Sequence, residues 1–166
     1  MWHIVLFVIL AFIVFWIAMY LAIVVHEFGH LIFRKIFGVP TQSVRIGTGP
    51  CICSVGCVQF RWFPLGGMNA PYTFCYPRVN RKKKIVIYGA GSAVNFIFSI
   101  VFSIISLGLP FPLNMIPFSM AICNFLLIFN LIPHRKGKSV SDGLMIIALL
   151  YNMEFLPPDH PCENEL

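Results

Sequence analysis

The chain has 166 residues, of which 58% are apolar and 11% charged, and its mean hydropathy is +0.84. Soluble domains carry about a quarter charged residues, so this composition excludes an ordinary soluble protein and indicates an integral membrane protein. The net charge of +6 fits basic loops held at an anionic lipid bilayer, and we expect no nucleic-acid partner.

The first predicted element is a membrane-spanning helix over residues 3–33. Ile4 to Val25 is a run of 22 residues without a charge, longer than the roughly 18 that indicate a spanning helix. A cleaved secretory signal is the alternative, but the first three residues lack a basic segment and no small-x-small cleavage site follows. Arg34 and Lys35 mark the cytoplasmic end of the helix.

The same helix continues into the sequence His26-Glu27-Phe28-Gly29-His30. Ionisable side chains at membrane depth cost a few kcal/mol each and are functional candidates by default. His26 and His30 are four residues apart, so both imidazoles share a helix face and can reach one tetrahedral zinc ion. Glu27 can then take a proton from a water molecule that attacks a peptide carbonyl. A solvated polar helix end is the plain alternative.

A catalytic zinc of this kind takes three protein ligands. No Asp or Glu occurs between Glu27 and Asp142, which leaves few candidates for the third ligand. Asp142 is the first of them and Glu154 the second. Asp142 is also, with Ser139 and Ser141, a candidate N-cap for the following helix, and the two roles do not exclude each other.

Cysteines are concentrated in the segment between the first two predicted spans. Four of the six fall in this basic loop, which we assign to the cytoplasm, where disulfides are rare. A structural zinc on three of them would lack a fourth ligand, so we expect free thiols. The six are Cys51, Cys53, Cys57, Cys75, Cys123 and Cys162.

The remaining topology follows from the basic residues, which all lie in 34–84 and 135–138. Under the positive-inside rule both stretches face the cytoplasm, so the apolar chain between them must cross the membrane twice. This predicts spans at 85–108 and 113–133, with the N-terminus outside. The last apolar segment, 144–156, is too short to cross and is expected to form a half-helix.

The sequence therefore predicts a membrane all-α protein with a three-span core. We expect a single transmembrane unit over 1–156 and a polar C-terminal tail over 157–166. The oligomeric state is left open.

Taken together, the motifs resemble the site-2 protease family of intramembrane zinc metalloproteases. This resemblance covers nearly the whole chain, in five ordered segments. They are Val25-His-Glu-Phe-Gly-His30, Arg45-Ile-Gly-Thr-Gly49, Phe63-Pro-Leu-Gly-Gly67, Gly89-Ala-Gly-Ser-Ala-Val-Asn95-Phe96, and Asn130-Leu-Ile-Pro133 with Asp142-Gly143.

The resemblance implies an endopeptidase that cleaves a membrane-anchored protein or peptide in or near its spanning segment. One zinc ion would be held by His26, His30 and Asp142, with Glu27 as general base. The site would open to the cytoplasm, most simply in a bacterial cytoplasmic membrane. Regulated intramembrane proteolysis and peptide processing both fit this activity.

The resemblance further implies a membrane-associated β-hairpin in the first cytoplasmic loop, and Val44 to Leu65 alternates loosely enough for two strands. Segment 64–67 would be a turn beside the site, with Gly66 and Gly67 contacting substrate. Asn95 would hydrogen-bond the substrate backbone, or simply belong to a small-residue packing face. Asn130 would help to shape the substrate site.

Two departures leave room for other functions. Eight residues separate Pro133 from Asp142, where relatives have about four, and the short turn between the second and third spans holds no PDZ domain. One alternative is a zinc protease working outside the lipid, which would require Glu154. Another is a non-catalytic membrane scaffold or immunity-type protein that retains a metal site.

Overall fold

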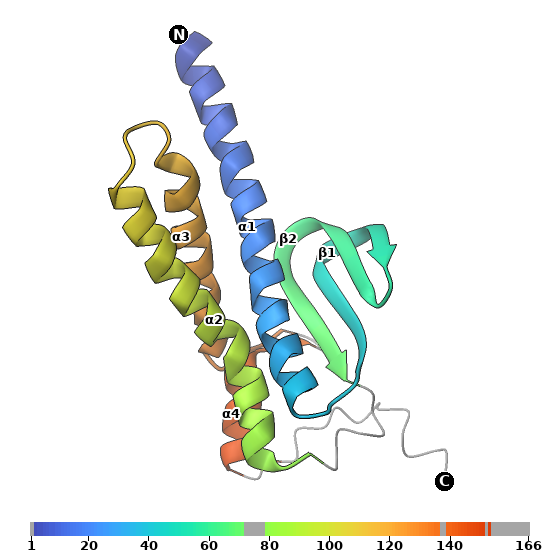
Figure 1. Cartoon of the computed structure of the whole chain (residues 1–166). Helices are drawn as coiled ribbons and strands as arrows, with labels where there is room; N and C mark the ends of the chain where they lie inside the picture. The colour runs from blue at the N-terminus through green and yellow to red at the C-terminus, as the bar shows by residue number, and fades with distance from the viewer. Residues whose placement is uncertain (1, 72–78, 137–138, 152, 154–166) are drawn as a thin grey trace.

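The computed structural model describes residues 2–71, 79–136, 139–151 and 153, and these are mostly helical (Figure 1). In chain order the elements are helix α1 (Trp2–Ile36), strands β1 (Thr41–Val55) and β2 (Val58–Pro71), helices α2 (Arg81–Leu107) and α3 (Met115–Ile128), the 3₁₀ turn η1 (Phe129–Leu131), strands β3 (Arg135–Lys136) and β4 (Ser139–Val140), and helix α4 (Asp142–Leu150).

Within the described residues, α1 and α2 are the two helices long and apolar enough to cross a membrane. With 35 residues, α1 is about 52 Å long. The first and second predicted spans are therefore confirmed as apolar helices. Helix α2 starts four residues earlier than predicted, because the Asn80 side chain caps it by accepting from the backbone N–H of Lys82 at 3.0 Å.

The third apolar helix is shorter than the predicted span at 113–133. It runs from Met115 to Leu131 when the 3₁₀ turn is included. Ile132 is extended, with ψ of 123°, as expected for a residue that precedes a proline. Whether this segment forms a third span stays a prediction.

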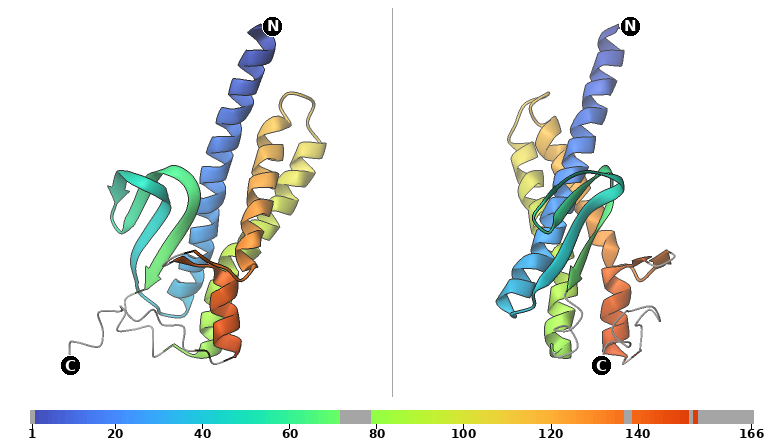
Figure 2. Two further views of the ribbon diagram at one scale, coloured as in Figure 1. Left: turned by 180° about the vertical axis from the view of Figure 1, so that it is seen from behind. Right: turned by 90° about the vertical axis from the view of Figure 1, so that its right-hand side faces the viewer.

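Helix α1 lies between two layers: α2 and α3 pack on one side and the β1–β2 hairpin on the other (Figure 2). On the helical side, the small residues Ala18 and Ala22 let α3 approach, and they are buried against Met120 and Cys123. The N-terminal part of α1 is largely exposed apolar surface, which suits a lipid environment. The packed part of α1 is its C-terminal half, which carries His26 and His30.

On the other side, the hairpin is fixed to α1 by Val44 and Ile46, which are buried against Ile23. The Tyr20 hydroxyl also donates a hydrogen bond to the backbone carbonyl of Arg61. Two strands were predicted within 44–65 and are confirmed, but they extend over 41–71.

The turn predicted at 64–67 is wrong, because these residues lie within β2. Between the pairs Thr48–Phe63 and Ile46–Gly67 the register is irregular, and Gly66 takes a φ of +86°. A positive φ strains any residue with a Cβ, so a local bulge at glycine absorbs the bend that the sequence suggested as a turn.

The eight-residue segment before Asp142 closes on itself as a small hairpin. Strands β3 and β4 pair Arg135 with Val140 and Lys136 with Ser139. The long basic segment therefore returns the chain to its starting point, so the extra length does not carry Asp142 away. Helix α4 follows with Ser141 as its N-cap. The predicted half-helix at 144–156 is confirmed as far as Leu150; residues 154–156 and the predicted tail at 157–166 lie outside the described residues.

Candidate metal centre

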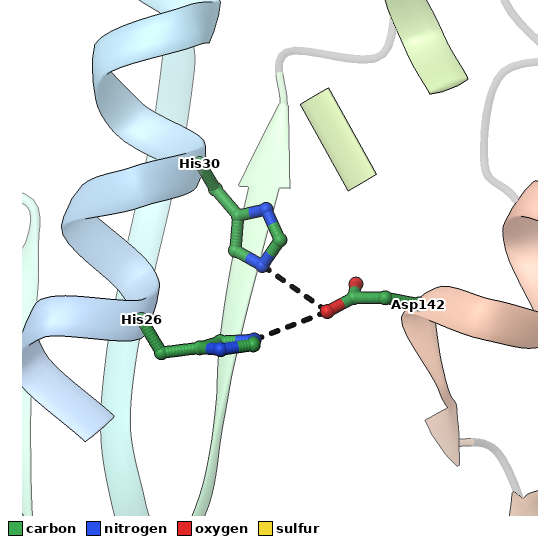
Figure 3. Close-up of side chains that lie close together, drawn as sticks. All are labelled: His26, His30 and Asp142. Atoms are coloured by element: carbon green, nitrogen blue, oxygen red, sulfur yellow. Dashed lines mark hydrogen bonds and ion pairs between the residues drawn. The ribbon is translucent and has the colours of Figure 1, made fainter. Parts of the chain in front are cut away.

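Three side chains from two distant helices meet at one point (Figure 3). Nε2 of His26 lies 3.1 Å from Oδ2 of Asp142, and Nε2 of His30 lies 3.2 Å from the same oxygen. All three side chains are largely buried, with His26 and His30 each 5% exposed. Within the described part of the chain, this is the one group of three or more His, Cys, Asp or Glu side chains whose ligand atoms converge.

The geometry of this cluster fits a zinc ion. Zinc bonds to nitrogen and oxygen are about 2.0–2.1 Å long, so ligand atoms around a tetrahedral zinc lie roughly 3.3–3.4 Å apart. The two nitrogen–oxygen separations of 3.1 and 3.2 Å are close to this value, and all three ligand atoms lie within 4.8 Å of one another. Two imidazoles and one carboxylate also leave a fourth position open, as catalytic zinc sites require.

Helix α4 carries Asp142 to this point through close contacts with η1. The Ser141 hydroxyl donates to the backbone carbonyl of Ile132 at 2.9 Å and accepts from the N–H groups of His134 and Leu144. A Cβ at Gly143 would overlap the carbonyl group of Leu131. Packing therefore explains why glycine follows Asp142, because only glycine lets α4 begin this close to η1.

Helix α2 forms the wall behind both histidines. A Cβ at Gly91 would lie 2.6 Å from Nε2 of His30 and 2.8 Å from Nε2 of His26. A Cβ at Gly29 would come within 2.9 Å of the Ala90 carbonyl oxygen. The two glycines let α1 and α2 touch at this level, and Nδ1 of His30 reaches the backbone carbonyl of Ile87 at 2.7 Å.

Asn130 from η1 contacts the carboxylate of Asp142. Its amide nitrogen donates to Oδ2 of Asp142 at 2.6 Å and lies 3.4 Å from Nε2 of His26. Burial by itself raises the pKa of Asp142, but the two imidazoles beside the carboxylate lower it to about 2. The carboxylate is therefore charged at physiological pH, as a metal ligand must be.

Glu27 lies next to the histidines and against the hairpin. It is 3% exposed, and a Cβ at Gly67 would overlap its Oε1 atom and lie 3.0 Å from the Arg45 carbonyl oxygen. Strand β2 thus passes directly over the carboxylate. Gly67 was predicted to lie beside the site, and the structure places it there; its neighbour Gly66 faces open space.

The other predicted site residues have mixed positions. Asn95 is fully buried, with its amide nitrogen 3.3 Å from Nδ1 of His26, so it lies at the centre, and its contact with substrate stays a prediction. Glu154, the second candidate ligand, lies outside the described residues. Cys51, Cys53 and Cys57 are free and exposed, as expected, while Cys75 and Cys162 lie outside the described residues.

Sequence reasoning missed what Gly29 and Gly91 do at the centre, whereas Ser141, one of the candidate N-caps, is confirmed as the N-cap of α4. Gly91 stood out only as a small residue in an apolar helix, which indicates close packing without naming the partner. The carbonyl of Ile87 gives no sequence signal at all, because every residue carries the same backbone group.

This arrangement defines a class: a buried His₂Asp centre with an adjacent glutamate, of the kind used by metallohydrolases, on an apolar helix long enough to span a membrane. Comparison with family models agrees. The model for peptidase family M50, the site-2 protease family, matches residues 14–112, more than half of the chain, and the chain belongs to this family of membrane zinc metalloproteases. The match includes His26, Glu27 and His30 and ends before Asp142. No match was found among curated proteins.

Proposed function

We propose that the protein is an intramembrane zinc endopeptidase with His26, His30 and Asp142 as metal ligands and Glu27 as general base. The observation that carries the proposal is the convergence of three buried ligand atoms from α1 and α4 beside Glu27. Membership of family M50 supports a metalloprotease.

The residues divide the chemistry between them. When bound, zinc supplies a Lewis acid that polarises a peptide carbonyl and lowers the pKa of a water molecule to about 7. Glu27 accepts the proton of the attacking water and passes it to the leaving amine. Asn130 holds the Asp142 carboxylate in place. The walls formed by α2 and β2 exclude bulk water, which strengthens each of these interactions.

The hairpin is the element we assign to substrate binding. It carries exposed apolar side chains, among them Ile52, Trp62, Phe63 and Leu65, which suit contact with lipid or with an apolar substrate segment. Strand β2 passes over Glu27, so a substrate strand paired with the hairpin would present its backbone to the centre. Membrane-anchored proteins and peptides are the substrate class that this surface favours.

The membrane topology follows the charges. The basic end of α1 and the basic start of α2 lie at the same end of the molecule (Figure 1), which supports placing that end in the cytoplasm. With α3 as a third crossing, the N-terminus lies outside and the centre opens toward the cytoplasm. A bacterial cytoplasmic membrane is the simplest setting for this arrangement.

The test uses the full chain reconstituted in lipid vesicles with single-span reporter proteins. We expect zinc-dependent cleavage within or next to the reporter's spanning segment, mapped by mass spectrometry and abolished by a chelator. A soluble domain of the same reporter without its spanning segment should remain uncut. Binding of one zinc without cleavage of any reporter, by a protein that retains its fold, would favour the non-catalytic scaffold instead.

A further inference from the structure

The two metal-binding imidazoles contact α2 through their second nitrogen atoms. Nδ1 of His30 lies 2.7 Å from the carbonyl oxygen of Ile87, and Nδ1 of His26 lies 3.3 Å from the side-chain amide of Asn95. Ile87 and Asn95 are eight residues apart on α2, with Gly91 between them. One face of α2 therefore lies against both rings.

For His30, the contact with the Ile87 carbonyl determines which ring nitrogen carries the proton. A carbonyl oxygen can only accept a hydrogen bond, so Nδ1 of His30 must carry the proton and donate it. The lone pair of a neutral imidazole is then on Nε2, which faces Asp142. The backbone of α2 thus selects the tautomer that binds metal through Nε2.

For His26, the hydrogen-bond acceptor for Nδ1 has to come from Asn95. Zinc ligation through Nε2 leaves the proton on Nδ1, which needs an acceptor. Asn95 has one, because a half turn of its amide exchanges the oxygen and nitrogen with almost no change of shape. The exchange gives Asn95 Oδ1, which is buried and has no hydrogen-bond partner among the described residues, the N–H of His26 as its donor, and the amide nitrogen takes the position that Oδ1 leaves.

We propose that Asn95 is a positioning residue: its amide oxygen accepts a hydrogen bond from Nδ1 of His26 and holds the ring with the Nε2 lone pair toward the metal. This role replaces substrate binding for Asn95, whose side chain is fully buried. The proposal rests on the zinc site proposed above. It assigns α2 the task of fixing both histidine ligands, one through a backbone carbonyl and one through a side chain.

The test measures zinc affinity by competition with a chelating dye, using the full chain in detergent. Asn95→Leu keeps the volume but removes the acceptor, and we expect its zinc Kd to rise about 10- to 100-fold. Asn95→Asp keeps an acceptor and should bind zinc within a few-fold of the unaltered protein. Asn124→Leu is the matched control, because Asn124 is an equally buried amide whose nitrogen donates to the Met120 carbonyl, and its loss should leave the affinity unchanged.

A merely structural role predicts the opposite order. A residue that only fills space tolerates Leu and is harmed by a buried charge, so an unchanged affinity in Asn95→Leu would overturn the proposal. So would an Asn95→Asp variant as weak as Asn95→Leu, because the amide would then act as a donor. If Asn95→Leu does not fold, Asn95→Asp decides alone: retained affinity supports the role, and a tenfold loss contradicts it. Failure of the unaltered protein to bind zinc would count against the proposed function itself.

Discussion

Asn130 donates its amide N–H to Oδ2 of Asp142 at 2.6 Å, the oxygen that also faces both histidines. This bond fixes which carboxylate oxygen faces the metal position and in which direction. Partners of this kind typically account for 10- to 100-fold in metal affinity. The relationship links the 3₁₀ turn after α3 to the first residue of α4.

Removing that donor should weaken zinc binding. We expect Asn130→Leu to raise the zinc Kd about 10- to 100-fold, measured by dye competition. Asn130→Asp should bind no better than Asn130→Leu, because it removes the donor and places a second negative charge beside Asp142. Asn114→Leu is the control, since Asn114 precedes α3 as its N-cap residue and makes no side-chain capping bond. Equal affinities in all three variants would rule out this role for Asn130.

Gly91 should tolerate no side chain. A methyl group there would lie 2.6 to 2.8 Å from imidazole atoms of His26 and His30, so Gly91→Ala must move a ligand. We expect at least a tenfold loss of zinc affinity, although the substitution favours the helix by about 0.5–1 kcal/mol. Gly89→Ala has the same effect on the helix but meets nothing within 4 Å, and it should bind zinc normally. Similar behaviour of the two variants would contradict the packing described for α2.

We expect a side chain at Gly67 to lower the rate of cleavage but not the zinc content. Its missing Cβ leaves room for the Glu27 carboxylate, so Gly67→Ala should lower kcat about tenfold or more with zinc content retained. Gly66→Ala meets no atom but strains a φ of +86°, which costs about 1–2 kcal/mol of stability. We expect this second variant to melt earlier while keeping most of its kcat. An unaltered rate in Gly67→Ala would contradict the claim that β2 at Gly67 makes room for the Glu27 carboxylate.

Ser141 should stabilise the start of α4. Its hydroxyl caps the helix and joins Ile132 to His134, so Ser141→Ala loses three hydrogen bonds and about 1–2 kcal/mol. Thermal unfolding in detergent measures this loss, and zinc affinity should fall with it because Asp142 is the next residue. Ser141→Thr keeps the hydroxyl and should recover most of both. A fully stable Ser141→Ala variant would mean that β3 and β4 alone hold the segment.

Local patterns in the sequence were enough to predict which side chains converge at the candidate metal centre. His26, Glu27 and His30 stand out because ionisable residues interrupt an apolar helix at metal-binding spacing. Asp142 stands out because the chain before it contains no other carboxylate back to Glu27. Both signals depend on single residues and their spacing, which a sequence states directly.

The supporting contacts depend on how helices cross, and a single sequence does not state that. The meeting of Gly91 with the histidine rings, or of Gly143 with the Leu131 carbonyl, requires the relative placement of two elements. For the eight residues between Pro133 and Asp142, the sequence gives the length but not the path of the chain. Pairing of Arg135 with Val140 closes it through backbone hydrogen bonds, to which side-chain identity contributes little.

The central claim, that Glu27 performs the chemistry at a metal held by His26, His30 and Asp142, is tested most directly by one paired measurement. Zinc content and reporter cleavage are determined on the same preparations of the unaltered protein and of Glu27→Gln. We predict about one zinc per chain in both, with cleavage reduced at least about 100-fold in the variant. A Glu27→Gln protein that cleaves the reporter as fast as the unaltered chain would contradict the account.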